Sequence, residues 1–239
     1  MTSTLAKGTV DISFMVPCYN EEKNVEKALE TIWSAMVVRS LTYEILIIDD
    51  GSVDNTSVVV RAYQTAHPDF PIRLHRNDSN QGLGASYFEG AELTRGQYYM
   101  IVNGDGDMSA ESLSKIIDRI GEADIISPYV TNHRQRPFTR RVVSRLFKKL
   151  VDLLGGHRLR YYNGPVLHRR MNIVEAETRT RGFGYQAELL CLLLKKGCSV
   201  LEVPYASVYS HHQTDAFRWS NILSVLASLY RIFLARLKR

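Results

Sequence analysis

Two aspartates one residue apart, Asp105 and Asp107, follow an apolar segment directly in the stretch MIVNGDGDMS. Carboxylates in this spacing suit either a calcium loop, in which oxygen ligands recur at every second residue, or an Asp-x-Asp pair that holds a divalent ion against a diphosphate. An EF-hand loop needs glycine at its sixth position and a bidentate carboxylate at its twelfth. Counted from Asn103, these positions hold Met108 and Ser114. The pattern therefore favours Mg²⁺ or Mn²⁺, bound by the two aspartates together with substrate phosphates.

A glycine-rich turn, NQGLGAS, occupies residues 80–86 and contains Gly82 and Gly84. A dinucleotide-binding fingerprint would need a third glycine where Tyr87 stands, and a Walker A loop would need a Gly-Lys-Ser/Thr sequence that this turn lacks. We therefore interpret the stretch as a tight turn before a helix, with backbone amides that are able to face a bound nucleotide.

Apolar segments of strand length alternate with helical segments through the first half of the chain. The expected elements, in order, are strand 12–16, helix 21–36 capped by Asn20, strand 44–48, helix 56–66, strand 72–75, a helix ending near residue 93, strand 98–102, helix 110–120 capped by Ser109, and strand 123–127. This order predicts an α/β fold with a Rossmann-like, mostly parallel sheet flanked by helices. Such sheets bind ligands beyond the carboxyl ends of their strands. The polar clusters at 17–21, 49–52 and 104–107 all follow strands, so we expect them to form one site.

The composition is that of a globular protein with an ample core: the 239 residues are 45% hydrophobic and 23% charged. No linker-like or repeated stretch divides the chain, so we predict one domain over residues 1–218 and a helical tail over 219–239. We see no apolar signal segment at the N-terminus, no run of about 18 apolar residues, and no C-x-x-C pair among the three cysteines. These features predict a cytoplasmic protein.

Positive charge is concentrated in the second half of the chain. Residues 133–151 contain seven Lys or Arg and no acid, and residues 218–239 contain five more, again with no acid. Apolar residues recur at helical spacing in the tail, which predicts a helix that either packs on the domain or lies in a membrane interface. We expect an anionic partner, on the cytoplasmic face of a membrane. Nucleic acid is disfavoured because the acidic clusters would repel its phosphates unless a metal intervened.

Four motifs stand in a characteristic order: VPCYNEE at 16–22, IDDGSVDNT at 48–56, NQGLGAS at 80–86 and NGDGDMS at 103–109. Together they resemble the signature of family 2 glycosyltransferases, most of all the dolichyl- or polyprenyl-phosphate sugar synthase branch. The similarity continues more loosely through residues 162–205. It implies a GT-A fold, an inverting mechanism, a UDP- or GDP-sugar donor, and a polyprenyl phosphate or another membrane-associated acceptor.

The resemblance also implies roles for single residues on the donor side. Metal and diphosphate would be held by Asp105 and Asp107, the base would be contacted by Asp50, and the nucleotide pocket would further be lined by Pro17, Tyr19, Glu21 and Gly82. The chemistry is sensible, because a carboxylate accepts the N–H groups of uracil or guanine and Tyr19 offers a stacking face. We expect Asp49 and Asp54 mainly to shape the turn and cap the following helix.

On the acceptor side the chain departs from the family. Phosphate-acceptor members carry Ser-Arg-Tyr where this chain reads Ser127-Pro128-Tyr129. The family's Arg-x-x-x-Ser element is met by Arg140 and Ser144. The family's late Arg-x-x-Gly-x-Ser-Lys loop, which closes on the diphosphate, is replaced here by residues 210–218. The missing arginine and this altered loop leave four further candidates for contact with an anionic acceptor or the diphosphate: Arg134, Arg136, His211 and Arg218.

The type of acceptor decides whether a base is needed. A lipid phosphate is already ionised, whereas a sugar hydroxyl needs a carboxylate to take its proton. In the second case, transfer to a hydroxyl in polysaccharide or glycolipid assembly, Glu188 in GYQAELL is the candidate base. Its alternative role is that of an acid at a helix N-terminus, where it favours the helix dipole.

Overall fold

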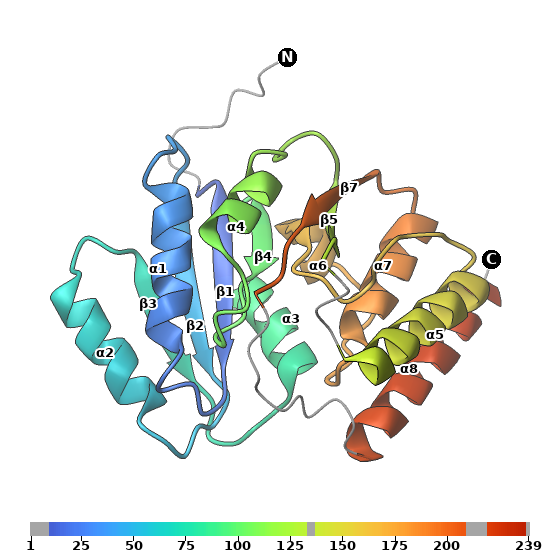
Figure 1. The fold of residues 1–239 in the computed structure, drawn as a ribbon, viewed down its shortest axis with the longest axis horizontal. Coiled ribbons are helices and arrows are strands. Elements are labelled where there is room, and N and C mark those ends of the chain that lie inside the picture. The colour runs from blue at the N-terminus through green and yellow to red at the C-terminus, as the bar shows by residue number, and fades with distance from the viewer. Residues whose placement is uncertain (1–9, 133–136, 209–218, 238–239) are drawn as a thin grey trace.

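Seven strands form one sheet in the order β3-β2-β1-β4-β6-β5-β7 (Figure 1). The computed structural model describes residues 10–132, 137–208 and 219–237. The strands are β1 (Ile12–Cys18), β2 (Tyr43–Asp49), β3 (Ile72–Arg76), β4 (Tyr98–Ile101), β5 (Ile125–Val130), β6 (Leu167–Arg169) and β7 (Val200–Tyr205). Every neighbouring pair is parallel except the two that involve β6. The predicted α/β fold with a mostly parallel sheet is confirmed.

Helices cover both faces of the sheet (Figure 1). They are α1 (Val25–Met36), α2 (Thr56–Ala66), α3 (Leu83–Leu93), α4 (Ala110–Ile117), α5 (Phe138–Gly155), α6 (Arg170–Val174), α7 (Tyr185–Lys195) and α8 (Trp219–Leu237). One core contains residues of α1, α2 and α4. The other contains residues of α3, α5, α6, α7 and α8. Because successive side chains of a strand point to opposite faces, Phe14 joins the first core and its neighbour Met15 the second.

The predicted start of the first helix is wrong. α1 begins at Val25, four residues after the predicted first residue. Asn20 does not cap it, because its backbone is left-handed with φ 60° and its side-chain oxygen accepts the N–H of Val53 at 2.9 Å. The side chain that was expected to cap α1 instead joins the loop after β1 to the loop after β2. The predicted cap of the later helix is confirmed, since Ser109 Oγ accepts the N–H of Ser112.

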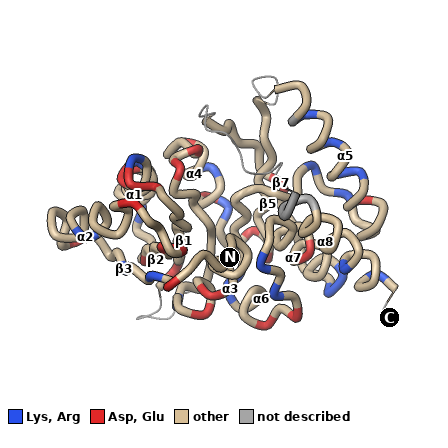
Figure 2. Tube along the Cα trace, turned by 90° about the horizontal axis from the view of Figure 1, so that it is seen from below, with Lys and Arg blue, Asp and Glu red and all other residues tan. Residues whose placement is uncertain are grey.

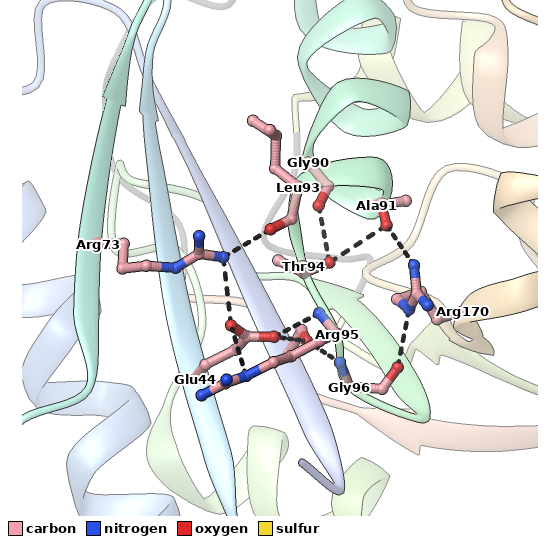
Figure 3. A network of polar contacts seen from close by, with 10 residues as sticks. Glu44, Arg73, Gly90, Ala91, Leu93, Thr94, Arg95, Gly96 and Arg170 are labelled. Atoms are coloured by element: carbon pink, nitrogen blue, oxygen red, sulfur yellow. Dashed lines mark hydrogen bonds and ion pairs between the residues drawn. The ribbon is translucent and has the colours of Figure 1, made fainter. Parts of the chain in front are cut away.

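At the amino-terminal edge of the sheet, a buried carboxylate holds several elements together (Figure 3). Glu44 on β2 accepts the Ser13 hydroxyl at 2.7 Å and the Arg95 N–H at 2.6 Å, and it pairs with Arg73 at 3.2 Å. Arg170 donates to the carbonyls that end α3 and precede β4. Each of these charged groups has a hydrogen-bond or ion-pair partner within the cluster, so we assign the cluster to the stability of the fold.

The predicted tail helix lies between 219 and 237 and packs against α5 and α7. Leu229 and Ile232 belong to the second core. The predicted boundary between the domain and its tail at residue 218 stays a prediction, and the described part of the tail, α8, shares the second core with the rest of the chain. Among the helices that the structure describes, none is long and apolar enough to cross a membrane.

Candidate functional site

Asp105 and Asp107 lie on a tight turn after β4. The backbone N–H of Asp107 donates to Asp105 Oδ1 at 3.2 Å, which fixes the Asp105 carboxyl group against the turn. Asn103 reaches Asp107 Oδ1 at 3.4 Å from the start of the turn. Both aspartates are partly exposed. The turn is anchored on its far side, where the N–H of Val208 donates to the Asp107 carbonyl at 2.8 Å.

Gly104 brings this turn into direct contact with the end of β1. A Cβ atom added at Gly104 would lie 2.7 Å from the carbonyl oxygen of Pro17 and 2.9 Å from Cys18 Sγ. Gly106 has φ 66° and faces the aliphatic part of Lys27 on α1. Since only glycine allows these approaches, the sequence of the turn is what places the aspartates beside the Pro17–Glu21 loop.

The thiol of Cys18 reports the electrostatics of this edge. Burial raises the pKa of Cys18 well above its usual value, and the carboxylates of Glu21, Asp49, Asp54 and Asp105 raise it further. Carboxyl groups from three separate stretches of sequence therefore act on one thiol at the carboxyl edge of the sheet. Such a concentration of negative charge attracts a cation.

The donor-side residues of the first loop differ in exposure. Pro17 is half-buried at the end of β1, whereas Tyr19 is 47% exposed and leaves its ring accessible for stacking. Glu21 is held in place, because its N–H donates to Thr56 Oγ1 at 2.9 Å and its carboxylate accepts from Asn24 at 2.8 Å. Their contact with a nucleoside stays a prediction.

Asp49 and Asp50 both lie buried at the end of β2. Asp49 accepts the N–H of Ser52 at 2.9 Å, so its predicted role in shaping the turn is confirmed. Asp50 accepts the backbone N–H groups of Gln81 and Gly82, each at 2.9 Å, and the side chain of Asn77 at 2.8 Å. In this structure Asp50 fixes the glycine-rich loop, and its contact with a base stays a prediction.

Asp54 accepts hydrogen bonds from the first residue of α2, although the N-cap position itself is held by Asn55, whose side chain makes no cap bond. The Asp54 Oδ1 atom accepts the N–H and the hydroxyl of Thr56.

A hollow of about 480 Å³ lies beside the glycine-rich loop. It is lined by Asn77, Asp78, Ser79, Gln81, Ala85, Glu89 and Arg181.

The predicted acceptor residues are only partly described. Arg134, Arg136, His211 and Arg218 lie outside the described residues, and so does the side chain of Arg140. Ser144 lies half-buried on α5. Beside Pro128, the guanidinium of Arg160 lies 4.4 Å from the ring centroid of Tyr129. Sequence reasoning missed Arg160, because nothing in its own stretch of sequence indicates that it folds back on β5.

Glu188 lies buried in the first turn of α7 with both oxygens engaged. Arg231 of α8 pairs with it in a bidentate manner, with Nη2 to Oε1 at 2.9 Å and Nε to Oε2 at 3.1 Å. Thr178 and Thr180 donate their hydroxyls to Oε2 at 2.9 Å and 2.6 Å. The role of Glu188 as a base stays a prediction. Its ion pair with Arg231 was not predicted from the sequence.

The donor set fits a hard divalent ion with an incomplete protein shell. Two carboxylates stand on one glycine-containing turn, as Mg²⁺ and Mn²⁺ sites that share a substrate phosphate require. Within the described ranges, no group of three or more His, Cys, Asp or Glu side chains could close around a metal. Phosphate oxygens and water would therefore complete the coordination of an ion held by Asp105 and Asp107.

Comparison with known proteins agrees with this arrangement. Residues 13–178 match the family model described as glycosyl transferase family 2. The polyprenol monophosphomannose synthase of Mycolicibacterium smegmatis is 30% identical over 80% of this chain and 74% of its own length. The dolichol-phosphate mannosyltransferase of Pyrococcus furiosus is 24% identical over 92% of this chain, which spans only 63% of that relative.

A solved structure shares the fold. The glucosyl-3-phosphoglycerate synthase of Mycobacterium tuberculosis, in complex with Mn²⁺, UDP and phosphoglyceric acid, superposes with a TM-score of 0.67 at 17% identity, over 93% of this chain and 79% of that one. At this identity the likeness extends to the GT-A type of fold and no further.

Proposed function

Because the chain belongs to glycosyltransferase family 2, we propose that it moves a sugar from a UDP- or GDP-sugar to a polyprenyl phosphate at a membrane surface. The observation that carries the donor half is the contact between the Asp105–Asp107 turn and the end of β1, through Gly104. Lipid-phosphate acceptors occur in the names of the two relatives above. The acceptor half rests on those relatives and on two features of this chain.

On the donor side, the chain's own groups would bind and orient the nucleotide. Asp105 and Asp107 would hold Mg²⁺ or Mn²⁺ against the diphosphate, and Tyr19 would stack on the base. The glycine-rich loop would line the nucleotide pocket at Gly82, although the amides of Gln81, Gly82 and Gly84 donate to Asp50 and to the Arg181 carbonyl. When bound, the metal supplies Lewis-acid stabilisation of the charge that develops on the leaving diphosphate. The acceptor oxygen would then attack the anomeric carbon from the opposite side, as inversion requires.

The surroundings of Glu188 favour a phosphate acceptor over a hydroxyl acceptor. A general base needs a free oxygen within hydrogen-bond reach of the proton that it takes. Both oxygens of Glu188 are engaged by Arg231 and two threonines. An ionised lipid phosphate attacks without a base, so this arrangement does not hinder it. Pro128, in place of the family's arginine, is the one feature that favours the alternative of transfer to a sugar hydroxyl.

Helices α5 and α8 supply a surface that suits a membrane. They lie side by side (Figure 1), and Figure 2 shows basic residues along α5. Large apolar side chains are exposed at helical spacing on both: Phe138, Val142, Leu146 and Leu153 on α5, and Leu223, Leu226, Tyr230, Phe233 and Leu237 on α8. Apolar stripes accompanied by basic residues bind anionic lipid interfaces. We place this surface on the cytoplasmic face of a membrane.

The proposal is tested by incubating the full chain with UDP- and GDP-sugars, with Mg²⁺ or Mn²⁺, and with polyprenyl phosphate in anionic vesicles. We expect metal-dependent transfer to the lipid from one class of donor. Asp107→Ala should lower kcat at least about 100-fold, since a metal contributes several kcal/mol to the transition state. The matched control is Asp69→Ala, which removes an exposed aspartate from the loop after α2.

Two outcomes would contradict the proposal. Undiminished transfer by Asp107→Ala would refute the role of Asp107 in holding the metal. Transfer only to a sugar hydroxyl, with polyprenyl phosphate inert, would replace the acceptor by the alternative.

A further inference from the structure

The segment Thr178–Gly184 lies between the glycine-rich loop and helix α8. It follows α6 and leads into α7, and it contains two glycines in the sequence RGFGY. One side of the segment contacts the start of α3, and the other side contacts α8. A displacement of α8 would therefore be transmitted to the loop that Asp50 holds.

On the α8 side, serines fit against the two glycines. A Cβ atom added at Gly182 would overlap Ser224 Oγ, and one added at Gly184 would overlap Ser228 Oγ. Gly184 has φ −80°, so the requirement for glycine there is one of space and not of backbone conformation. Because only the short serine side chains separate the segment's backbone from the helix, the contact leaves little freedom for sliding.

The same contact contains an ion pair in which the glutamate is buried and Arg231 has 47% of its side chain exposed. Glu188 has 4% of its side chain exposed, and both oxygens accept from the guanidinium of Arg231. Oε2 of Glu188 also accepts from Thr178 and Thr180, which belong to the segment itself. Arg231 thus holds α7, α8 and the segment together through a single carboxylate. Removing one partner of such a pair leaves the other charge buried and unmatched.

On the other side, the segment supports the glycine-rich loop through its backbone. The N–H of Gly84 donates to the Arg181 carbonyl at 2.8 Å. A Cβ atom at Gly82 would lie 2.8 Å from that carbonyl oxygen. Gly82 in turn donates its N–H to Asp50 at 2.9 Å. The contacts therefore run without a gap from Arg231 through Glu188, Thr180 and Arg181 to the loop that faces the donor.

We propose that Arg231 is a positioning residue of the donor site, acting through Glu188 and the Thr178–Gly184 segment on the glycine-rich loop. The membrane-facing helix α8 is then also a structural part of the nucleotide site. This inference rests on the proposed function, because it assumes that the glycine-rich loop binds the nucleotide of the donor. It assigns to Glu188 a positioning role that its hydrogen bonds to Arg231, Thr178 and Thr180 support.

The first experiment compares Arg231→Ala with Arg236→Ala in the full chain. Arg236 lies on the same helix and donates to the Leu153 carbonyl, away from the segment. We measure the dissociation constants of UDP and GDP with Mn²⁺ by calorimetry, and hydrogen exchange of residues 81–84 and 178–184. Arg231→Ala should weaken the binding of the preferred nucleotide about 3- to 30-fold, the usual range for coupling through a packed network. It should also speed exchange in both stretches, while Arg236→Ala changes neither.

A second pair of variants keeps the test valid if Arg231→Ala folds poorly. Gly184→Ala inserts a methyl group against Ser228, and the double variant Gly184→Ala with Ser228→Gly removes the atoms that it meets. We expect the single variant to weaken nucleotide binding and the double variant to restore it. General stabilisation of the protein cannot explain such a recovery of nucleotide binding, because Ser228→Gly places a glycine in α8 and by itself lowers the stability of that helix.

The outcomes separate this inference from the proposed function. If the unaltered chain binds neither nucleotide, the donor site itself is refuted. If it binds one of them, and Arg231→Ala and Gly184→Ala bind it equally well, the positioning role of Arg231 is refuted and the donor site stands. Weakening by Arg236→Ala to the same extent would also refute it, since the effect would then belong to α8 stability in general.

Discussion

Gly104→Ala tests the contact that brings the aspartate turn to the end of β1. An added methyl carbon would lie 2.7 Å from the Pro17 carbonyl oxygen, inside the 3.4 Å at which ordinary contact begins. The nearest atoms are backbone on one side and the buried Cys18 sulfur on the other, so the turn has to move away by about 0.5 to 0.7 Å. A misplacement of about 1 Å at a reacting centre costs about 100-fold in rate, so we expect kcat to fall about 10- to 30-fold.

The assay is the rate of sugar transfer at saturating donor over a range of Mn²⁺ concentrations, with a thermal melt alongside. Overpacking should lower the free energy of unfolding by about 1 to 3 kcal/mol. The control is Gly121→Ala, which forces a side chain onto a φ of 89° at a surface turn after α4 and should cost stability without loss of rate. A Gly104→Ala protein that keeps its kcat within twofold would refute the claim that this close approach positions the aspartates.

Two further predictions concern pH and membranes. Burial lowers the pKa of His168 to about 3, so the unfolded chain binds a proton between about pH 6.5 and 3 that the folded chain does not. The stability contributed by neutral His168 is fully present above pH 6.5 and is lost as the pH falls below it. Between pH 7 and pH 5, the free energy of unfolding from denaturant titrations should fall by about 2 kcal/mol more for the unaltered chain than for His168→Gln. An equal fall in both proteins would contradict the argument from burial. Leu226→Glu, on the exposed face of α8, should reduce flotation with anionic vesicles about tenfold, since it removes one large apolar side chain from the interface. Val58→Glu on α2 should have no effect, and equal flotation of both variants would exclude the α5–α8 surface as the docking face.

The positions of the strands could be predicted from the local sequence pattern, whereas the contacts that the loops after them make could not. β1, β2, β3 and β4 lie within two residues of their predicted ends. For β1, β2 and β4 the reason is that buried parallel strands are near-continuous apolar runs bounded by polar turns. The start of α1 was missed because Asn20 bonds to a loop 33 residues away. A cap is a local interaction, and a distant partner that competes for the same side chain is not visible in the neighbouring sequence.

The donor-side candidates could be named from the sequence, because each motif follows a strand and the carboxyl ends of parallel strands meet at one edge. Contacts between segments that are distant in the sequence could not be predicted in this way. Arg231 and Glu188 are 43 residues apart, and nothing in either helix pattern predicts that they meet. Arg160 and Tyr129 are joined in the same way by a loop that folds back on β5.

The sequence by itself determined the fold class and the family, and it named Asp105 and Asp107 as candidate metal ligands, since periodicity, strand-end motifs and residue type are properties of short stretches. Only the tertiary structure decided that Gly104 presses the aspartate turn against β1, that Asp50 holds the glycine-rich loop, and that α8 packs on the domain. Those facts depend on which surfaces meet when the chain folds, and the packing of distant segments is a collective outcome that no single stretch encodes.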